Sequence, residues 1–340
     1  MWRDPGKLLL VIGFTLTILS TLVVAIRLHI RHVQMHNAGL SDYTMLVALI
    51  STWINTVLNY YQTKFGKDAR LSQVEKDPTS PKVQAAVSGT LVTWFIYRAT
   101  YVFCLSLVKL SILIFYRTLV PPSTSFRSFR LFRYTVYTLI AFIILYTLFA
   151  MAASIFQCTP ISAAYSVSAS YSQLPKNRAS PKPHCYKPTN IWVFSAIFNF
   201  ATDAIILILP VPIILSLPSM PLRKRVGLLC ILSLGMLTIA AGAVRMWILV
   251  LWAKDVRSQS KYGTELLMWG QVEVNCGIIG ASAPFLRAVF RECFKRRASK
   301  LERMDMRTHV VEKMEAKGLE VSFAASEKII GWVDVVEEGK

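Results

Sequence analysis

Long apolar stretches separated by short polar connections run through most of this chain. A bilayer core about 30 Å thick needs about 20 consecutive, mainly apolar residues for each crossing helix. Seven segments meet this requirement, at about 8–30, 43–62, 89–116, 134–156, 191–215, 226–250 and 265–286. The pattern therefore predicts an all-α fold, a polytopic bundle of seven transmembrane helices.

A few ionisable and amide side chains interrupt these segments. A lone charge in hydrocarbon costs at least about 2.5 kcal/mol, so such residues should face inward and pair. We expect Arg98 or Arg245 to form an ion pair with Glu273, next to a pocket open to the outside. The candidate pocket residues are Arg98, Asn199, Asp203, Arg245, Glu273 and Asn275. The alternative is a sealed ion-pair network that fixes how the helices pack.

The segment after the last span has a different character. Apolar residues recur at helical spacing between 286 and 294 with Arg and Lys between them, which predicts an amphipathic helix on the inner leaflet. From about Met304 onward the chain is mixed and charged, which is typical of a flexible tail. We divide the chain into a seven-helix domain, 1–291, and a cytoplasmic tail, 292–340.

Composition and charge narrow the class of protein. Of the 340 residues, 54% are hydrophobic and the formal net charge is +19. The charges lie in connections and near span ends, where anionic lipid is the simplest partner, and no nucleic-acid partner is expected. The loops do not decide orientation, but the basic start of the tail favours a cytoplasmic C-terminus and an outside N-terminus, in the plasma membrane.

The cysteines and histidines offer candidates for a disulfide and for a metal site. Cys158 and Cys185 bracket the connection between the fourth and fifth spans, on the side taken as external, and we predict a disulfide there; two unrelated thiols are the alternative. His29, His32 and His36 could share a helix face and bind zinc, but interfacial polar residues are the better interpretation and no metal site is predicted. Several Trp and Tyr residues toward span ends, Trp94 and Trp252 among them, fit an interfacial aromatic belt.

No catalytic sequence motif occurs: His-Glu-x-x-His, Gly-x-Ser-x-Gly and the Walker pattern are all missing from the sequence. We therefore predict no catalytic residue, no cofactor and no enzymatic activity.

The motifs inside the spans resemble those of the fungal rhodopsin-like integral membrane proteins, over residues 8–291. Residues 108–117 read VKLSILIFYR, which is similar to that family's Lys-Leu-Ser-Ile-Leu…Tyr-Arg signature. FQCTP at 156–160 is similar to its Phe-x-Cys-x-Pro motif, with Cys185 as the later loop cysteine. The residues assigned to the family motif are Lys109, Ser111, Tyr116, Arg117 and Pro284.

This resemblance implies a receptor-like membrane protein that senses an extracellular small molecule, with a cytoplasmic signalling partner as a further candidate. A transporter or channel-like protein that uses the buried ionisable residues is the alternative, and a membrane scaffold without ligand is a third interpretation. Retinal is rejected because a Schiff base needs a deep lysine, and 262–290 contains none. Lys109 lies within about two turns of the end of its span, where we expect it to snorkel to the interface.

Overall fold

The computed structural model describes residues 4–34, 39–68, 80–119, 127–165, 184–185, 189–211, 222–254 and 258–283. All of these residues belong to one compact unit, Met1–Leu286. The predicted amphipathic helix, the tail and Pro284 lie outside the described residues.

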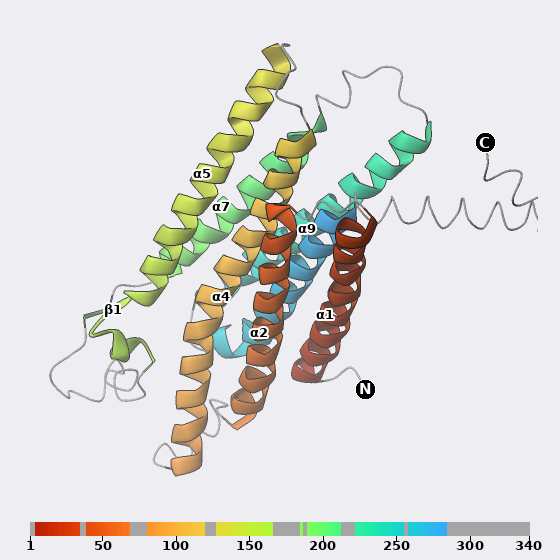
Figure 1. Ribbon diagram of the computed structural model, residues 1–340. Coiled ribbons are helices and arrows are strands. Elements are labelled where there is room, and N and C mark those ends of the chain that lie inside the picture. The colour runs from red at the N-terminus through yellow and green to blue at the C-terminus, as the bar shows by residue number, and fades with distance from the viewer. Residues whose placement is uncertain are drawn as a thin grey trace, which may run out of the picture. The chain divides into compact units, whose positions relative to one another are not determined.

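Seven long helices occur in the described part of the chain (Figure 1). They are α1 (Pro5–His29), continued by a π-helical turn (Ile30–Gln34), then α2 (Leu40–Asp68), α4 (Pro81–Leu119), α5 (Arg127–Ile155), α7 (Thr189–Ile208), α9 (Leu222–Trp252) and a last helix at 258–283. Each predicted span coincides with one of these helices, apart from 212–215 and 284–286, which are not described. The prediction of an all-α polytopic bundle is confirmed.

Five of the seven helices are long and apolar enough to cross a membrane by length and composition. The other two, α2 and helix 258–283, carry buried polar side chains that lower their mean hydropathy, such as Asn55 and Gln62 on α2 and Gln271 on the last helix. On α5, by contrast, large apolar side chains such as Leu148 are exposed, as expected on a lipid-facing surface. The chain is an integral membrane protein whose least apolar helices bury their polar faces.

Hydrophobic packing joins α1, α2, α4 and helix 258–283. Leu9, Met45, Cys104 and Ile278, one from each of these helices, are almost completely buried in a single cluster. A second cluster joins α4, α5 and α7 around Leu113, Val136 and Ile206. These two clusters hold α4 at the centre of the packing, between α2 on one side and α5 on the other.

A buried arginine ties four helices together at the end of α1. Arg27 is 1% exposed and its Nε donates a hydrogen bond of 3.0 Å to Asp42 Oδ1 at the start of α2. Its Nη2 donates to Ser41 Oγ at 2.6 Å, and its Nη1 donates to the carbonyl of Ala281 at 3.2 Å. Ser41 in turn hydrogen-bonds Ser111 of α4 at 3.1 Å. One buried cation thus fixes the register of α1, α2, α4 and the last helix.

The connection between α5 and α7 contains a small, cross-linked element. Strands β1 (Cys158–Thr159) and β2 (His184–Cys185) pair antiparallel with Cys158 opposite Cys185, and a 3₁₀ turn (Ile161–Ala164) follows β1. The two cysteines form a disulfide, which confirms the predicted pairing.

Removing this disulfide should loosen the connection. We expect Cys185→Ser to destabilise the protein by about 2–4 kcal/mol, because the cross-link restricts the unfolded chain and joins the two ends of a long connection. The measurement is the thermal midpoint of the purified protein. A matched Cys158→Ser/Cys185→Ser double variant should be no less stable than either single variant, and a further large loss would show that the thiols act separately.

Candidate functional site

A cavity of about 100 Å³ lies between α4, α5, α7, α9 and helix 258–283. Its lining comes from the later part of α5 (Tyr146 to Ser154) and the early part of α7 (Ile191 to Asn199), so it occupies the half of the bundle nearest the disulfide. The volume is enough for several water molecules or an equivalent organic group.

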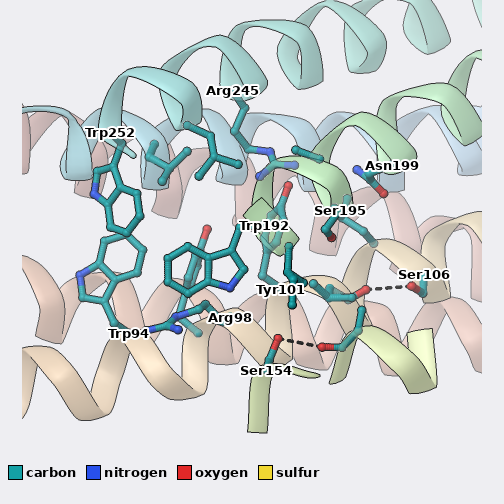
Figure 2. A pocket seen from close by; sticks show the side chains of 18 of the residues that line it. Trp94, Arg98, Tyr101, Ser106, Ser154, Trp192, Ser195, Asn199, Arg245 and Trp252 are labelled. Carbon is teal, nitrogen blue, oxygen red and sulfur yellow. Dashed lines mark hydrogen bonds between the residues drawn. The ribbon is translucent and has the colours of Figure 1, made fainter. Parts of the chain in front are cut away.

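Aromatic rings form much of the cavity wall, as Figure 2 shows for Trp94, Trp192 and Trp252. The ring centroids of Trp94 and Trp252 are 5.7 Å apart, and those of Trp192 and Trp252 are 5.6 Å apart. These distances are typical of favourable aromatic pairs. The interfacial belt predicted for Trp94 and Trp252 is therefore wrong, because the two rings face the cavity, whereas Trp247 is 67% exposed.

Arg98 brings a positive charge to the aromatic side of the cavity (Figure 2). Its Nη1 donates to Gln157 Oε1 at 2.7 Å, and its guanidinium carbon lies 4.3 Å from the centre of the Trp192 ring. The Trp192 ring thus holds the guanidinium by a cation–π interaction. Nothing in the sequence pattern pointed to Gln157 or Trp192, which are distant from Arg98 along the chain.

The inner end of the cavity is an ion pair with two further hydrogen bonds. Arg245 Nε donates to Glu273 Oε2 at 2.6 Å, and the Tyr101 hydroxyl donates to the same oxygen at 2.7 Å. Asn199 Nδ2 donates to the other carboxylate oxygen, Oε1, at 2.9 Å. The predicted pairing of Arg245 with Glu273 is present, and the Arg98 guanidinium contacts Gln157 and Trp192. Glu273 is only 2% exposed, so the pair is held in the bundle interior.

Lys109 continues this network into the interior. Its Nζ donates to Asn199 Oδ1 at 2.5 Å and to Thr202 Oγ1 at 2.7 Å, and it forms an ion pair with Asp203 Oδ1 at 3.2 Å. Lys109 is 5% exposed, so the prediction that it snorkels to the interface is wrong. Its side chain faces α7 rather than the helix end, and the ion pair with Asp203 offsets the electrostatic cost of burying the ammonium group.

Two glycines leave room for the network. A Cβ atom on Gly242 of α9 would lie 3.3 Å from Glu273 Oε1, and one on Gly270 would lie 2.7 Å from the Tyr97 hydroxyl. Larger residues at these points would push on the carboxylate or on the tyrosine. The close approach of α9 to the last helix therefore depends on glycine at 242, and that of α4 to the last helix depends on glycine at 270.

The remaining predicted residues lie elsewhere. Asn275 is fully buried on the other side of the last helix, where its Oδ1 accepts from Ser20 Oγ at 2.8 Å and its Nδ2 donates to the Gln271 carbonyl. It does not line the cavity. Of the motif residues, Ser111 belongs to the Arg27 cluster, and Arg117 lies 5.6 Å from the Tyr137 ring centre.

No group of three or more potential metal-ligating side chains occurs among the residues that the structure describes. His36 lies outside those residues, so the trio His29, His32 and His36 is not described as a whole.

Comparison with known proteins gives two matches. The family model described as "Fungal rhodopsin domain" matches residues 26–292. A protein described as "Receptor GIN3", from Arthrobotrys oligospora, is 31% identical over 101 residues, which cover 30% of this chain and 24% of that relative. The matched region thus spans about a quarter of the relative's length. No solved structure matches.

Proposed function

The chain belongs to the fungal rhodopsin domain family, and from this premise we propose a receptor-like sensor that binds a small amphipathic molecule from outside the cell. The observation that carries the proposal is the aromatic cavity at the disulfide end of the bundle, with its ion-paired inner end. We place the protein in the plasma membrane with its N-terminus outside and its C-terminus in the cytoplasm. In this orientation the cavity lies in the outer half.

The lining chemistry supports an amphipathic ligand. Ligand sites are concave, mostly apolar and carry a few well-placed polar groups. Trp94, Trp192 and Trp252 would cover an apolar or aromatic body, while the Arg98 guanidinium would donate hydrogen bonds to an acceptor on the ligand. The Tyr146 hydroxyl is already engaged with Ser195 of the same wall, which gives the cavity a second polar edge.

The inner network supports a signalling role. A ligand that displaces Tyr101 or Arg245 would change the hydrogen bonds to Glu273 and, through Asn199, those of Lys109. We propose that the bound ligand selects a second arrangement of these hydrogen bonds, because coupling to a cytoplasmic partner requires two arrangements with different affinity for the ligand. The proposal gives no catalytic role to these residues, whose charged groups are engaged with each other.

A transporter is the second candidate, because a further cavity lies beyond the ionisable network and shares Glu273 with it. Two cavities on either side of a charged gate would suit alternating access. Ligand-dependent uptake that continues when every cytoplasmic response is blocked would favour this candidate over a receptor.

The proposed function predicts a loss of sensitivity in cavity variants. In host cells carrying tags at both ends of the chain, a panel of amphipathic molecules should include one that evokes a response. Arg98→Gln and Trp192→Leu should each raise the half-maximal concentration at least about tenfold, because each removes an interaction on the ligand wall.

The matched control is Ile18→Ala, a 50%-exposed residue of α1 far from the cavity, which should leave the response unchanged. Equal surface labelling of all three variants separates binding from expression. Cavity variants that are as sensitive as the unsubstituted protein would contradict the proposed site.

A further inference from the structure

A second cavity of about 90 Å³ lies between α4, α7, α9 and helix 258–283, on the far side of the ion-paired network. Its walls are mainly apolar, with Val108, Phe115 and Ile206 among them, and Gly277, Gly280 and Ala281 provide a side with small residues. Lys109, Asp203 and Glu273 lie at its polar end. This cavity faces the helix ends opposite the disulfide and is separate from the aromatic one.

The polar end of this cavity offers a hydrogen-bond acceptor. Lys109 Nζ is engaged by Asn199, Thr202 and Asp203 Oδ1. The Thr238 hydroxyl donates to the Gly235 carbonyl of its own helix at 2.6 Å. Asp203 is different: its side chain is 21% exposed, and within the described residues its Oδ2 has no hydrogen-bond partner. A carboxylate oxygen only accepts, so a molecule in this cavity should bring a donor.

The charge of the network excludes an ionic ligand. Lys109 and Arg245 balance Asp203 and Glu273, through ion pairs of 3.2 and 2.6 Å. An additional charge in this low-dielectric interior would have no counterion and would be costly. The ligand should therefore be neutral, with one donor group and an apolar body that matches the walls.

We propose that this second cavity takes up the hydroxyl end of a neutral, apolar alcohol, either a sterol of the surrounding bilayer or a free long-chain alcohol, whose hydroxyl donates to Asp203 Oδ2. With a volume of about 90 Å³ the cavity holds this end of the molecule, and the rest of the molecule lies outside it. The carbon atoms next to the hydroxyl would lie along Val108, Phe115 and Ile206, against Gly280. This site is independent of the proposed outer ligand and does not rest on a receptor function.

Gly280 gives a means to fill the cavity. A Cβ atom there would meet only Leu234, at 3.7 Å from its Cβ, which is ordinary van der Waals contact. A leucine at 280 would extend beyond that first carbon into the space that the ligand would occupy. Gly66 serves as the matched control, because a Cβ there meets nothing within 4 Å.

Cys276 is a built-in reporter of occupancy. It lines this cavity and is 8% exposed, whereas Cys104 is completely buried. The full-length protein in sterol-free phospholipid nanodiscs would be treated with a small alkylating reagent, and adducts at each cysteine would be quantified by peptide mass spectrometry. Ergosterol, hexadecanol and the methyl ether of each would be added in separate arms.

The proposal predicts that at least one alcohol slows Cys276 alkylation about fivefold or more, while its methyl ether, which has no donor, does not. Protection by the sterol alone identifies a bilayer source, and protection by hexadecanol alone identifies a free alcohol. Gly280→Leu should abolish the protection and Gly66→Leu should retain it. Equal protection by alcohol and ether, protection by neither alcohol, or full protection in a folded Gly280→Leu protein would each overturn the proposal.

The comparison of alcohol with ether uses the unsubstituted protein, so it decides the matter even if Gly280→Leu does not fold. The outcome is also separate from that of the outer site. A lost response in Arg98→Gln with intact protection of Cys276 would support both proposals.

Discussion

Replacing Glu273 by leucine will destabilise the bundle by about 3–5 kcal/mol, the usual cost of leaving a buried charge without its partner. Arg245 would lose the carboxylate that lies 2.6 Å from its Nε, and Tyr101 and Asn199 would lose an acceptor. The free energy of unfolding can be measured by titration of the protein from mild detergent into dodecyl sulfate.

The matched control removes both charges. Because a well-packed apolar pair often replaces a buried ion pair at little cost, Glu273→Leu combined with Arg245→Met should recover most of the lost stability. Additive losses in the double variant would show that the two side chains act independently, contrary to the geometry of the pair.

A second large effect is expected for Arg27→Met, again about 3–5 kcal/mol. This change leaves Asp42 buried with Arg31 as its remaining cation, at 2.9 Å, and removes the donors to Ser41 and to the Ala281 carbonyl. Since Arg27 joins four helices, we also expect faster proteolysis near the junction of α1 and α2.

The control Lys7→Met tests whether removing any cation from α1 destabilises the protein as much as Arg27→Met does. Lys7 pairs with Asp4 at 3.8 Å, and both side chains are more than half exposed, so the effect should stay below about 1 kcal/mol. Similar losses in the Lys7 and Arg27 variants would contradict a special role for the buried arginine.

The sequence predicted the fold because its main signal, apolar length, is local. The same signal was weaker for α2 and helix 258–283, where Asn55, Gln62 and Gln271 face the interior. A charged side chain in lipid is energetically costly, so the charges inside the spans were expected to face inward and pair. Arg245 and Glu273 do so. The same cost applies to Lys109: it lies on the face of α4 that points to α7, and it pairs there with Asp203 although the end of its predicted span is only about two turns away.

The cavity could not be predicted in detail because it is assembled from five helices. A tryptophan near a span end suits both a lipid interface and an inward-facing wall, and the choice depends on helix rotation. Trp252 faces Trp94 and Trp192 only because α9 packs with that side toward α4 and α7. The separation of Asn275 from the other candidates has the same origin, since it lies on the opposite face of the last helix from Glu273.

The most direct test asks whether the aromatic cavity is reachable by water from outside the cell. Ser154 lines the cavity on α5, and its hydroxyl donates to the carbonyl of Ala150 in its own helix, so a cysteine should fit there. Leu148 of the same helix is 62% exposed toward lipid and provides the matched control as Leu148→Cys. A membrane-impermeant methanethiosulfonate applied to intact cells should label Ser154→Cys well above the unsubstituted protein and leave Leu148→Cys at background. Labelling of Ser154→Cys only after the membrane is permeabilised would contradict an outward-facing ligand cavity.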